Sequence, residues 1–141
     1  MKKDTRIWFI LLSGCLFCFD QALKCVAQTY PTYTWYIIDH TVGWEYFANP
    51  GIAFGISFPL IPLLIITPIT LWFFFYTQKP RTYYSSVGLA FICAGALSNM
   101  LDRIAYQYVI DYLRLITSMF NLADVYILVG MFILLRGQWK K

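Results

Sequence analysis

Four apolar stretches dominate this chain, and each approaches the length that a helix needs to cross a lipid bilayer. They cover residues 7–27, 58–76, 83–101 and 120–135, whereas a spanning helix takes about 17–25 residues. The fourth stretch is slightly short and is expected to borrow from residues 116–119. Only 13% of the residues are charged and the mean hydropathy is +0.60, while a soluble domain carries about 25% charged residues. The sequence therefore predicts an all-α membrane protein, with four transmembrane helices in a single domain over residues 1–141.

Basic residues predict the orientation of these helices. Eight of the eleven lysines and arginines fall in three places: before the first stretch, between the second and third, and after the fourth. The positive-inside rule puts such residues in the cytoplasm, so both termini are expected there. Residues 28–57 and 104–119 then form two segments on the outer side. The net charge of +4 follows from this topology, and nucleic acid is not an expected partner.

The two outer segments differ in composition. The first contains "TYPTYTWYIID", whose aromatic and β-branched residues favour extended structure, and it ends in an Asn-Pro-Gly turn signal. We expect a small β element at the membrane surface, where tyrosine and tryptophan collect. The second contains "YVIDYLRLI", which we interpret as an amphipathic piece at the interface.

The amino-terminal segment, the cysteines and the single histidine do not indicate a cleaved signal or a metal site. The start "MKKDTRIWFILLSGC" resembles a secretory signal ending at Cys15, but the chain stays apolar beyond Cys15, which favours a retained helix. The four cysteines lie within the apolar stretches, and we expect them to be small packing residues. His40 is the only histidine, so no metal site with histidine ligands and no cofactor is expected.

Polar residues gather at the outer end of the predicted bundle. Helical rise places the polar residues of the first and third stretches near their outer ends, and the fourth stretch begins with Asn121 and Asp124. Asp20 and Lys24 are four residues apart and share a helix face. Gly95 continues the face of the third helix on which the next polar residues lie, and a small residue there allows close helix packing. The candidates are Asp20, Lys24, Asn49, Asn99, Asp102, Arg103, Asp111, Asn121 and Asp124.

Each of these residues also has a purely structural interpretation. Asp20 with Lys24 can be a neutralising pair, and Asp102 is best explained as structural. Asn49 can serve its turn, and Asp111 can be a surface acid. Asn121 can cap the last helix, which would place Asp124 at the third helical position, where a carboxylate suits the free amides. For Asn99 and Arg103 the structural and functional interpretations are evenly balanced.

Paired aspartates offer a definite chemistry. If Asp111 and Asp124 meet, they share a proton over a broad pH range. The ionised carboxylate can then take a proton from water, while the protonated one polarises a carbonyl, as in aspartic proteases. A Ser–Lys hydrolase with Lys24 as base is a weaker alternative, because Ser57, Ser98 and Ser118 lie in no nucleophile motif. A small transporter or assembly factor is the non-enzymatic alternative, although transporters place polar groups near the bilayer midplane and often contain repeats.

Five blocks, in this order, resemble the bacterial lipoprotein signal peptidase family (prolipoprotein signal peptidase, or signal peptidase II). They are "DQALK" at 20–24, "NPGIAF" at 49–54, "GALSNMLDR" at 95–103, "VIDYL" at 109–113 and "FNLADVYI" at 120–127. The resemblance implies an aspartic endopeptidase of the bacterial inner membrane that removes signal peptides from diacylglyceryl-modified prolipoproteins, cleaving before the lipidated cysteine. It also implies a β-rich periplasmic element, a short periplasmic helix in the segment of Asp111, contact with membrane lipids, and inhibition by the cyclic peptide globomycin. We expect a monomer.

The resemblance assigns residues as well. It implies Asp111 and Asp124 as the catalytic pair. The supporting residues that it implies are Asp20, Lys24, Asn49, Gly51, Asn99, Arg103, Asn121 and Ala123. Two positions depart from the family pattern: Ser98 stands where glycine is usual, and Leu23 where a small hydroxyl residue is frequent.

Overall fold

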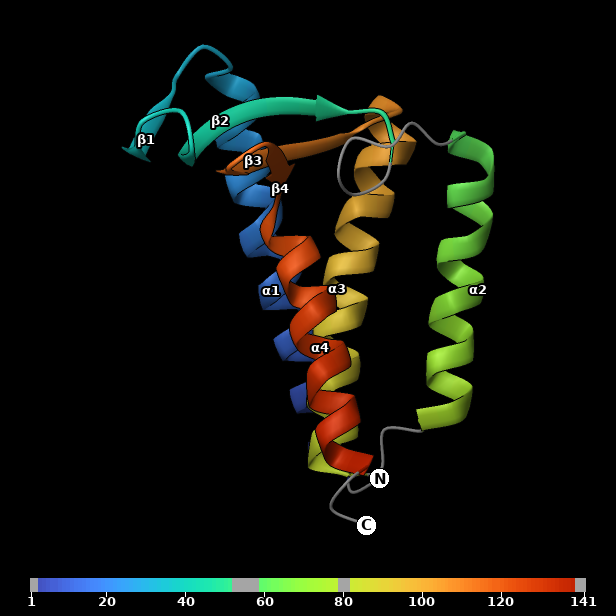
Figure 1. The fold of residues 1–141 in the computed structure, drawn as a ribbon. Coiled ribbons are helices and arrows are strands. Elements are labelled where there is room, and N and C mark those ends of the chain that lie inside the picture. The colour runs from blue at the N-terminus through green and yellow to red at the C-terminus, as the bar shows by residue number, and fades with distance from the viewer. Residues whose placement is uncertain (1–2, 52–58, 79–81, 139–141) are drawn as a thin grey trace.

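The structure, a computed structural model, describes residues 3–51, 59–78 and 82–138. Its helices are α1 (Lys3–Thr29), α2 (Leu60–Gln78), α3 (Tyr83–Tyr106) and α4 (Leu122–Gln138). Its strands are β1 (Trp35–Ile38), β2 (Val42–Asn49), β3 (Val109–Leu115) and β4 (Ser118–Phe120). Figure 1 shows the helices running side by side, with the strands across one end of the bundle. The helix α1 begins, and α4 ends, at the opposite end.

A helix covers most of each predicted span. The expectation that the fourth span borrows residues 116–119 is wrong, because Ser118–Phe120 form the strand β4 and α4 begins only at Leu122. By length and composition, Ile7–Thr29, Leu60–Gln78 and Tyr83–Tyr106 are each able to cross a membrane. The helix α4 has 17 residues and does not reach the length of the other three. The helix α2 has no buried residue. One face of it packs Leu71, Phe74 and Phe75 against the bundle, while seven large apolar side chains are exposed, as lipid contact requires: Ile61, Ile65, Ile66, Ile69, Trp72, Phe73 and Tyr76.

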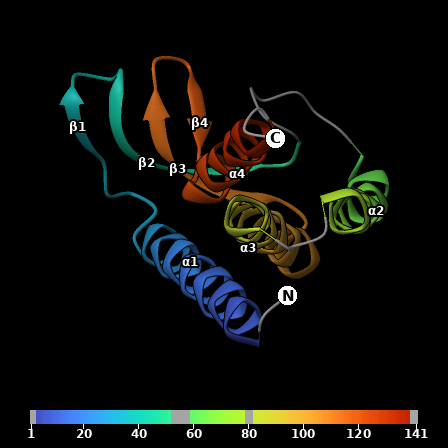
Figure 2. The ribbon, with the colours of Figure 1, turned by 90° about the horizontal axis from the view of Figure 1, so that it is seen from below.

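Helix α3 is the centre of the bundle. Seen along the helices in Figure 2, it lies among the other three and contacts each of them. A Cβ on Gly95 would lie 2.2 Å from the carbonyl oxygen of Ala123 in α4, and one on Gly130 would lie 2.6 Å from the carbonyl oxygen of Gly88. These glycines therefore let the backbones of α3 and α4 approach closely, as predicted for Gly95. The cysteine prediction holds only in part: Cys93 in α3 is buried, whereas the three cysteines of α1 are exposed on the helix surface.

The strands form one antiparallel sheet in the order β1-β2-β3-β4. The expected β element is present as β1 and β2, while residues 52–57 of that segment lie outside the described residues. The short helix expected around Asp111 is wrong, because Asp111 lies in β3 and pairs with Phe47 of β2. The fold is therefore dominated by helices but carries a four-stranded sheet, not an all-α architecture.

The alternation of residues along β3 explains this correction. Ile110 and Tyr112 point to one face and pack with Ala27 of α1 in a buried apolar cluster. Asp111 lies between them and points to the other face. A strand can bury the apolar pair and also present the acid, with β2 on one side and β4 on the other satisfying its backbone. The amphipathic pattern was correctly identified, but its period was assigned to the wrong structure.

Candidate active site

Asp111 is a buried carboxylate held by two asparagines. Its side chain is 1% exposed. Asn49, at the end of β2, donates its Nδ2–H to Oδ2 at 2.8 Å, and Asn121 donates its Nδ2–H to Oδ1 at 2.7 Å. Burial raises the pKa of Asp111 to about 6, the nearby charge of Asp124 adds to the increase, and the two asparagine hydrogen bonds oppose it. This carboxyl therefore keeps its proton more readily than an exposed aspartate does.

Asp124 lies at the third helical position of α4, as the capping pattern predicts. Its backbone N–H donates to Oδ1 of Asn121 at 3.0 Å, and its Oδ2 accepts from the backbone N–H of Asn121 at 3.4 Å. This reciprocal arrangement is a capping box. Asn99 of α3 donates its Nδ2–H to the remaining oxygen, Oδ1, at 2.8 Å. The cap thus orients the Asp124 carboxylate, which is also hydrogen-bonded to α3 through Asn99.

Asn121 joins the two aspartates. It donates through its side chain to Asp111 and through its backbone to Asp124. Its Nδ2 also lies within 3.2 Å of Ile110 O and of Asn99 Oδ1, and the residue is fully buried. A single asparagine therefore touches both carboxylates, which supports the prediction that Asp111 and Asp124 meet.

Lys24 is the centre of a buried ionic network beneath this pair. Its Nζ lies 3.1 Å from Asp20 Oδ2, 2.8 Å from Asp102 Oδ2 and 2.8 Å from Asn99 Oδ1. The predicted pair of Asp20 and Lys24 is confirmed, but a second carboxylate, that of Asp102, completes it. Because Lys24 donates to Asn99 Oδ1, it orients the amide so that the nitrogen faces Asp124. The network therefore acts on the pair through Asn99.

Asp20 and Asp102 also bind backbone amides. Asp20 Oδ1 accepts from the N–H of Ala123, and Asp102 Oδ2 accepts from the N–H of Ile110, both at 3.1 Å. Ala123 thus contributes its amide to this contact and its carbonyl group to the close approach of Gly95. The structural interpretation of Asp102 is confirmed, since the residue ties α3 to the strand that carries Asp111.

Gly51 and Arg103 lie at the edge of the cluster. The N–H of Gly51 donates to Asn49 Oδ1 at 3.0 Å, so Asn49 serves its turn and binds Asp111 at the same time. Arg103 reaches the carbonyl oxygens of Asn99 and Gly51 only at 3.4 Å, so both contacts are long. Its guanidinium is partly exposed and lines the groove beside Asp124.

Three polar residues of the network were not assigned a role from the sequence: Gln21, Ser98 and Tyr112. The Ser98 hydroxyl donates to Asp20 Oδ2 at 2.5 Å and accepts from Gln21 Nε2 at 2.9 Å. The departure from the usual glycine therefore adds a polar partner inside the network. Gln21 also donates to Asp102 Oδ1 at 3.0 Å. Gln21 and Ser98 lie among the polar residues of α1 and α3, and this position in the sequence could have identified them as members of the network. Tyr112 gave no such signal, because its segment was interpreted as an amphipathic piece at the interface.

The Ser–Lys alternative can be examined at Ser98, whose Oγ lies 3.3 Å from Lys24 Nζ. Both side chains are fully or almost fully buried. Lys24 Nζ is surrounded by Asp20, Asp102 and Asn99, so it is committed to these three partners and not directed at Ser98 alone. Ser98 donates its proton to Asp20, not to Lys24. Ser118 lies on β4, and Ser57 lies outside the described residues.

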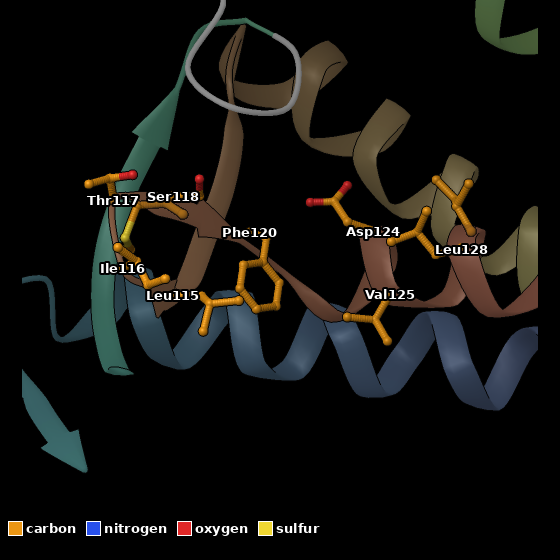
Figure 3. A pocket seen from close by; sticks show the side chains of 10 residues that line it. Leu115, Ile116, Thr117, Ser118, Phe120, Asp124, Val125 and Leu128 are labelled. Atoms are coloured by element: carbon orange, nitrogen blue, oxygen red, sulfur yellow. The ribbon is translucent and has the colours of Figure 1, made fainter. Parts of the chain in front are cut away.

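Two apolar grooves meet at Asp124. The larger, of about 620 Å³, runs between the β3–β4 hairpin and α4. Figure 3 shows Asp124 at one end of it, with Phe120 and Val125 along its wall. The smaller, of about 300 Å³, lies between α2, α3 and α4 and also includes Asn99 and Arg103. An apolar ligand can therefore reach Asp124 from two sides. Across residues 3–51, 59–78 and 82–138, no three histidine, cysteine or acidic side chains are grouped to hold a metal ion.

Fold and site together define a membrane aspartic peptidase. The family model described as signal peptidase (SPase) II matches residues 12–139. The chain belongs to the signal peptidase II family, and it is a hydrolase that processes prolipoproteins.

Individual relatives cover most of the chain. It is 33% identical to a lipoprotein signal peptidase of Gloeothece citriformis (strain PCC 7424), over 99% of this chain and 92% of the relative. It is 31% identical to that of Moorella thermoacetica (strain ATCC 39073 / JCM 9320), over 89% of each chain. Among solved structures, a bacterial membrane enzyme determined by the in meso method at 2.3 Å resolution superimposes with a TM-score of 0.82 and 26% identity, covering 94% of this chain and 87% of the other.

Proposed function

We propose that Asp111 and Asp124 are the catalytic pair with which this peptidase hydrolyses the bond before the lipidated cysteine of a prolipoprotein. The observation that carries the proposal is Asn121, which hydrogen-bonds both carboxylates. The partners of Asn121 come from β3 and from the first turn of α4, so the two acids are held together by the same residue that starts the helix.

The two aspartates divide the work by environment. Asp111, with its raised pKa, holds the proton and donates it towards the carbonyl oxygen of the scissile bond. Asp124 accepts from the backbone N–H of Asn121 at the positive end of the α4 dipole, which favours its ionised form; it accepts a proton from the attacking water. The water oxygen then bonds to the carbonyl carbon, and the tetrahedral intermediate collapses as the leaving nitrogen takes a proton from the pair. Asn99 and Asn121, which donate to the carboxylates, keep their oxygens oriented throughout.

The grooves support a substrate with two apolar parts. A prolipoprotein carries an apolar signal segment on one side of the scissile bond and diacylglyceryl chains close to the other. Asp124 is shared by the two apolar grooves, so the bond between these parts can lie at the carboxylate. The neighbouring residues have supporting roles. Lys24 orients Asn99, and Asp20 binds the amide of Ala123. Asn49 binds Asp111 and is itself held by Gly51, while Arg103 lines a groove.

The proposal includes a topology. The four spans form one domain, so both termini lie on the same side of the bacterial inner membrane. The positive-inside rule favours the cytoplasm for that side, and the site then lies at the periplasmic surface. Membrane lipids would surround the exposed apolar faces of the helices. The protein would act as a monomer, since one chain supplies both aspartates, and the cyclic peptide globomycin would inhibit it by occupying the site.

Prolipoprotein processing by Asp111→Asn and Asp124→Asn variants tests the catalytic pair. Each variant, purified in folded form, is expected to lose at least about 10³-fold in kcat, because neither acid–base step can be completed by the remaining carboxyl alone. Asp39→Asn is the matched control, since Asp39 is exposed at the far tip of the sheet, and it should cleave at the rate of the unmodified protein. Normal cleavage by either of the first two variants would overturn the assignment.

A further inference from the structure

Tyr112 follows Asp111 on β3 but points to the opposite face of the strand. Its side chain is fully buried and packs with Ala27 and Ile110. Its ring also lies at a tilt against that of Trp44, with ring centroids 4.8 Å apart. The position of the ring is therefore set by close packing on several sides. The position of the Tyr112 hydroxyl is therefore fixed as well.

The Tyr112 hydroxyl connects two parts of the site. It donates to Asp20 Oδ1 at 2.8 Å and accepts from the backbone N–H of Leu122 at 3.1 Å. The direction of both hydrogen bonds is unambiguous, because the amide can only donate and a hydroxyl has one proton to give. Burial and the neighbouring Asp20 raise the pKa of Tyr112, so the proton remains on the phenol and both hydrogen bonds persist.

Leu122 is the first residue of α4, and its amide has no acceptor within the helix. The next two amides have the same need, and each finds a side-chain acceptor in a different part of the chain. The amide of Ala123 donates to Asp20 of α1, and that of Asp124 donates to Asn121. Tyr112 supplies the contact from β3. The first turn of α4 is thus attached to the strand of Asp111 through the residue next to Asp111.

We propose that Tyr112 is a positioning residue that holds the carboxyl group of Asp124 at its working distance from that of Asp111. The inference rests on the proposed catalytic pair. Without the hydroxyl, the Leu122 amide has no acceptor and Asp20 loses one of its donors, so the first turn of α4 can move relative to β3. A displacement of about 1 Å between reacting groups costs about 10²-fold in rate.

The variant Tyr112→Phe removes only the hydroxyl. Its kcat for prolipoprotein cleavage is expected to fall by about 10- to 100-fold with KM within about twofold, because the grooves are untouched while the carboxyls are misplaced. Its pH–rate profile should also shift, since the coupling between two carboxyls depends on their separation. The matched control is Tyr46→Phe, which removes a hydroxyl bonded at 3.2 Å to that of Tyr108 on the same side of the molecule and should retain both kinetic constants.

A second variant removes the same hydrogen bond from the other end. Leu122→Pro deletes the donor at a helix position that accepts proline, and Leu122→Ala is its reference for the lost side chain. Leu122→Pro should lower kcat relative to Leu122→Ala. Adding Tyr112→Phe should then cause a smaller loss than it causes alone, because both changes remove the Leu122–Tyr112 hydrogen bond and only the bond to Asp20 remains to be lost. If Tyr112→Phe does not fold, the comparison of Leu122→Pro with Leu122→Ala still tests the positioning role of Tyr112.

The outcomes separate the two proposals. If Asp111→Asn and Asp124→Asn are inactive while Tyr112→Phe, or Leu122→Pro against its reference, keeps kcat within twofold and an unshifted pH profile, Tyr112 is only structural. If the aspartate variants are active, the catalytic pair itself is wrong. A lower melting temperature with unchanged kcat below that temperature also counts against the positioning role.

Discussion

Asn121 and Lys24 show how much depends on single polar groups in an apolar protein. Asn121 binds one acid through its backbone and the other through its side chain. Lys24 is ion-paired with two carboxylates and also orients the amide of Asn99. Removing one partner of a buried pair leaves the other uncompensated, at a cost of about 3–5 kcal/mol. Such residues therefore tolerate little change even where they do not touch the substrate.

The raised pKa of Asp111 makes stability depend on pH. Its folded-state pKa of about 6 lies above the ordinary value of 3.8, so between these values the folded protein holds a proton that the unfolded chain has released. Its contribution to stability therefore falls as pH rises through this window, by up to about 3 kcal/mol at 1.4 kcal/mol per pKa unit. Asp111→Asn has no carboxyl at this position and does not lose stability in this way. The free energy of unfolding of the variant minus that of the unmodified protein should therefore increase between pH 4 and pH 7. Denaturant titration in detergent micelles measures this difference.

The control for this pH effect is Asp39→Asn. Asp39 is exposed on the turn of the sheet, so any pH dependence that its variant shows is the background to subtract from that of Asp111→Asn. A difference for Asp111→Asn that does not change with pH after this subtraction would mean that the Asp111 carboxyl is not perturbed by burial.

Among the elements, the contact between α3 and α4 places the site most directly. Gly95 allows the α3 backbone to lie against Ala123, one residue before Asp124. The same close approach recurs further along both helices at Gly88 and Gly130. Because these contacts involve backbone atoms and not flexible side chains, α4 has little freedom to shift against α3.

Adding one methyl group at Gly95 should therefore be costly. In Gly95→Ala the new Cβ would lie 2.2 Å from the Ala123 carbonyl oxygen, so the helices must separate, at a cost of about 1–3 kcal/mol. Gly14→Ala on α1 is the matched control, because nothing lies within 4 Å of a Cβ there. It should gain about 0.5–1 kcal/mol from lower backbone entropy. Thermal unfolding of both variants in micelles measures the contrast, and equal shifts would contradict the close contact.

At the scale of the whole molecule, sequence reasoning predicted the four helices and the end of the bundle at which the polar residues meet. Apolar length and charge were enough for that prediction. The secondary structure expected for the Asp111 segment, a short helix, was wrong, because the pairing of β3 with β2 depends on residues far apart in the chain. The pairing of Lys24 with Asp102 and the contacts of Tyr112 were missed for the same reason: they join α1, α3 and β3, and no local spacing records them.

The proposed orientation predicts which positions can be labelled from outside the cell. In a background without the natural cysteines, Asp39→Cys lies on an exposed turn of the sheet, and Arg136→Cys lies in the last turn of α4 at the other end. A membrane-impermeant maleimide should reach position 39 when the outer membrane alone is opened, and position 136 only after the inner membrane is disrupted. The reverse pattern would invert the topology.

The first turn of α4 has a consequence for biosynthesis. Its three amides take their acceptors from β3, from α1 and from Asn121, so the carboxylate of Asp124 is aimed only after the first and last helices have met around the strand between them. A chain still emerging from the ribosome, or one only partly inserted, has both aspartates but no assembled site. Under the proposed assignment, the catalytic pair is therefore assembled only once α1, β3 and α4 have come together in the membrane.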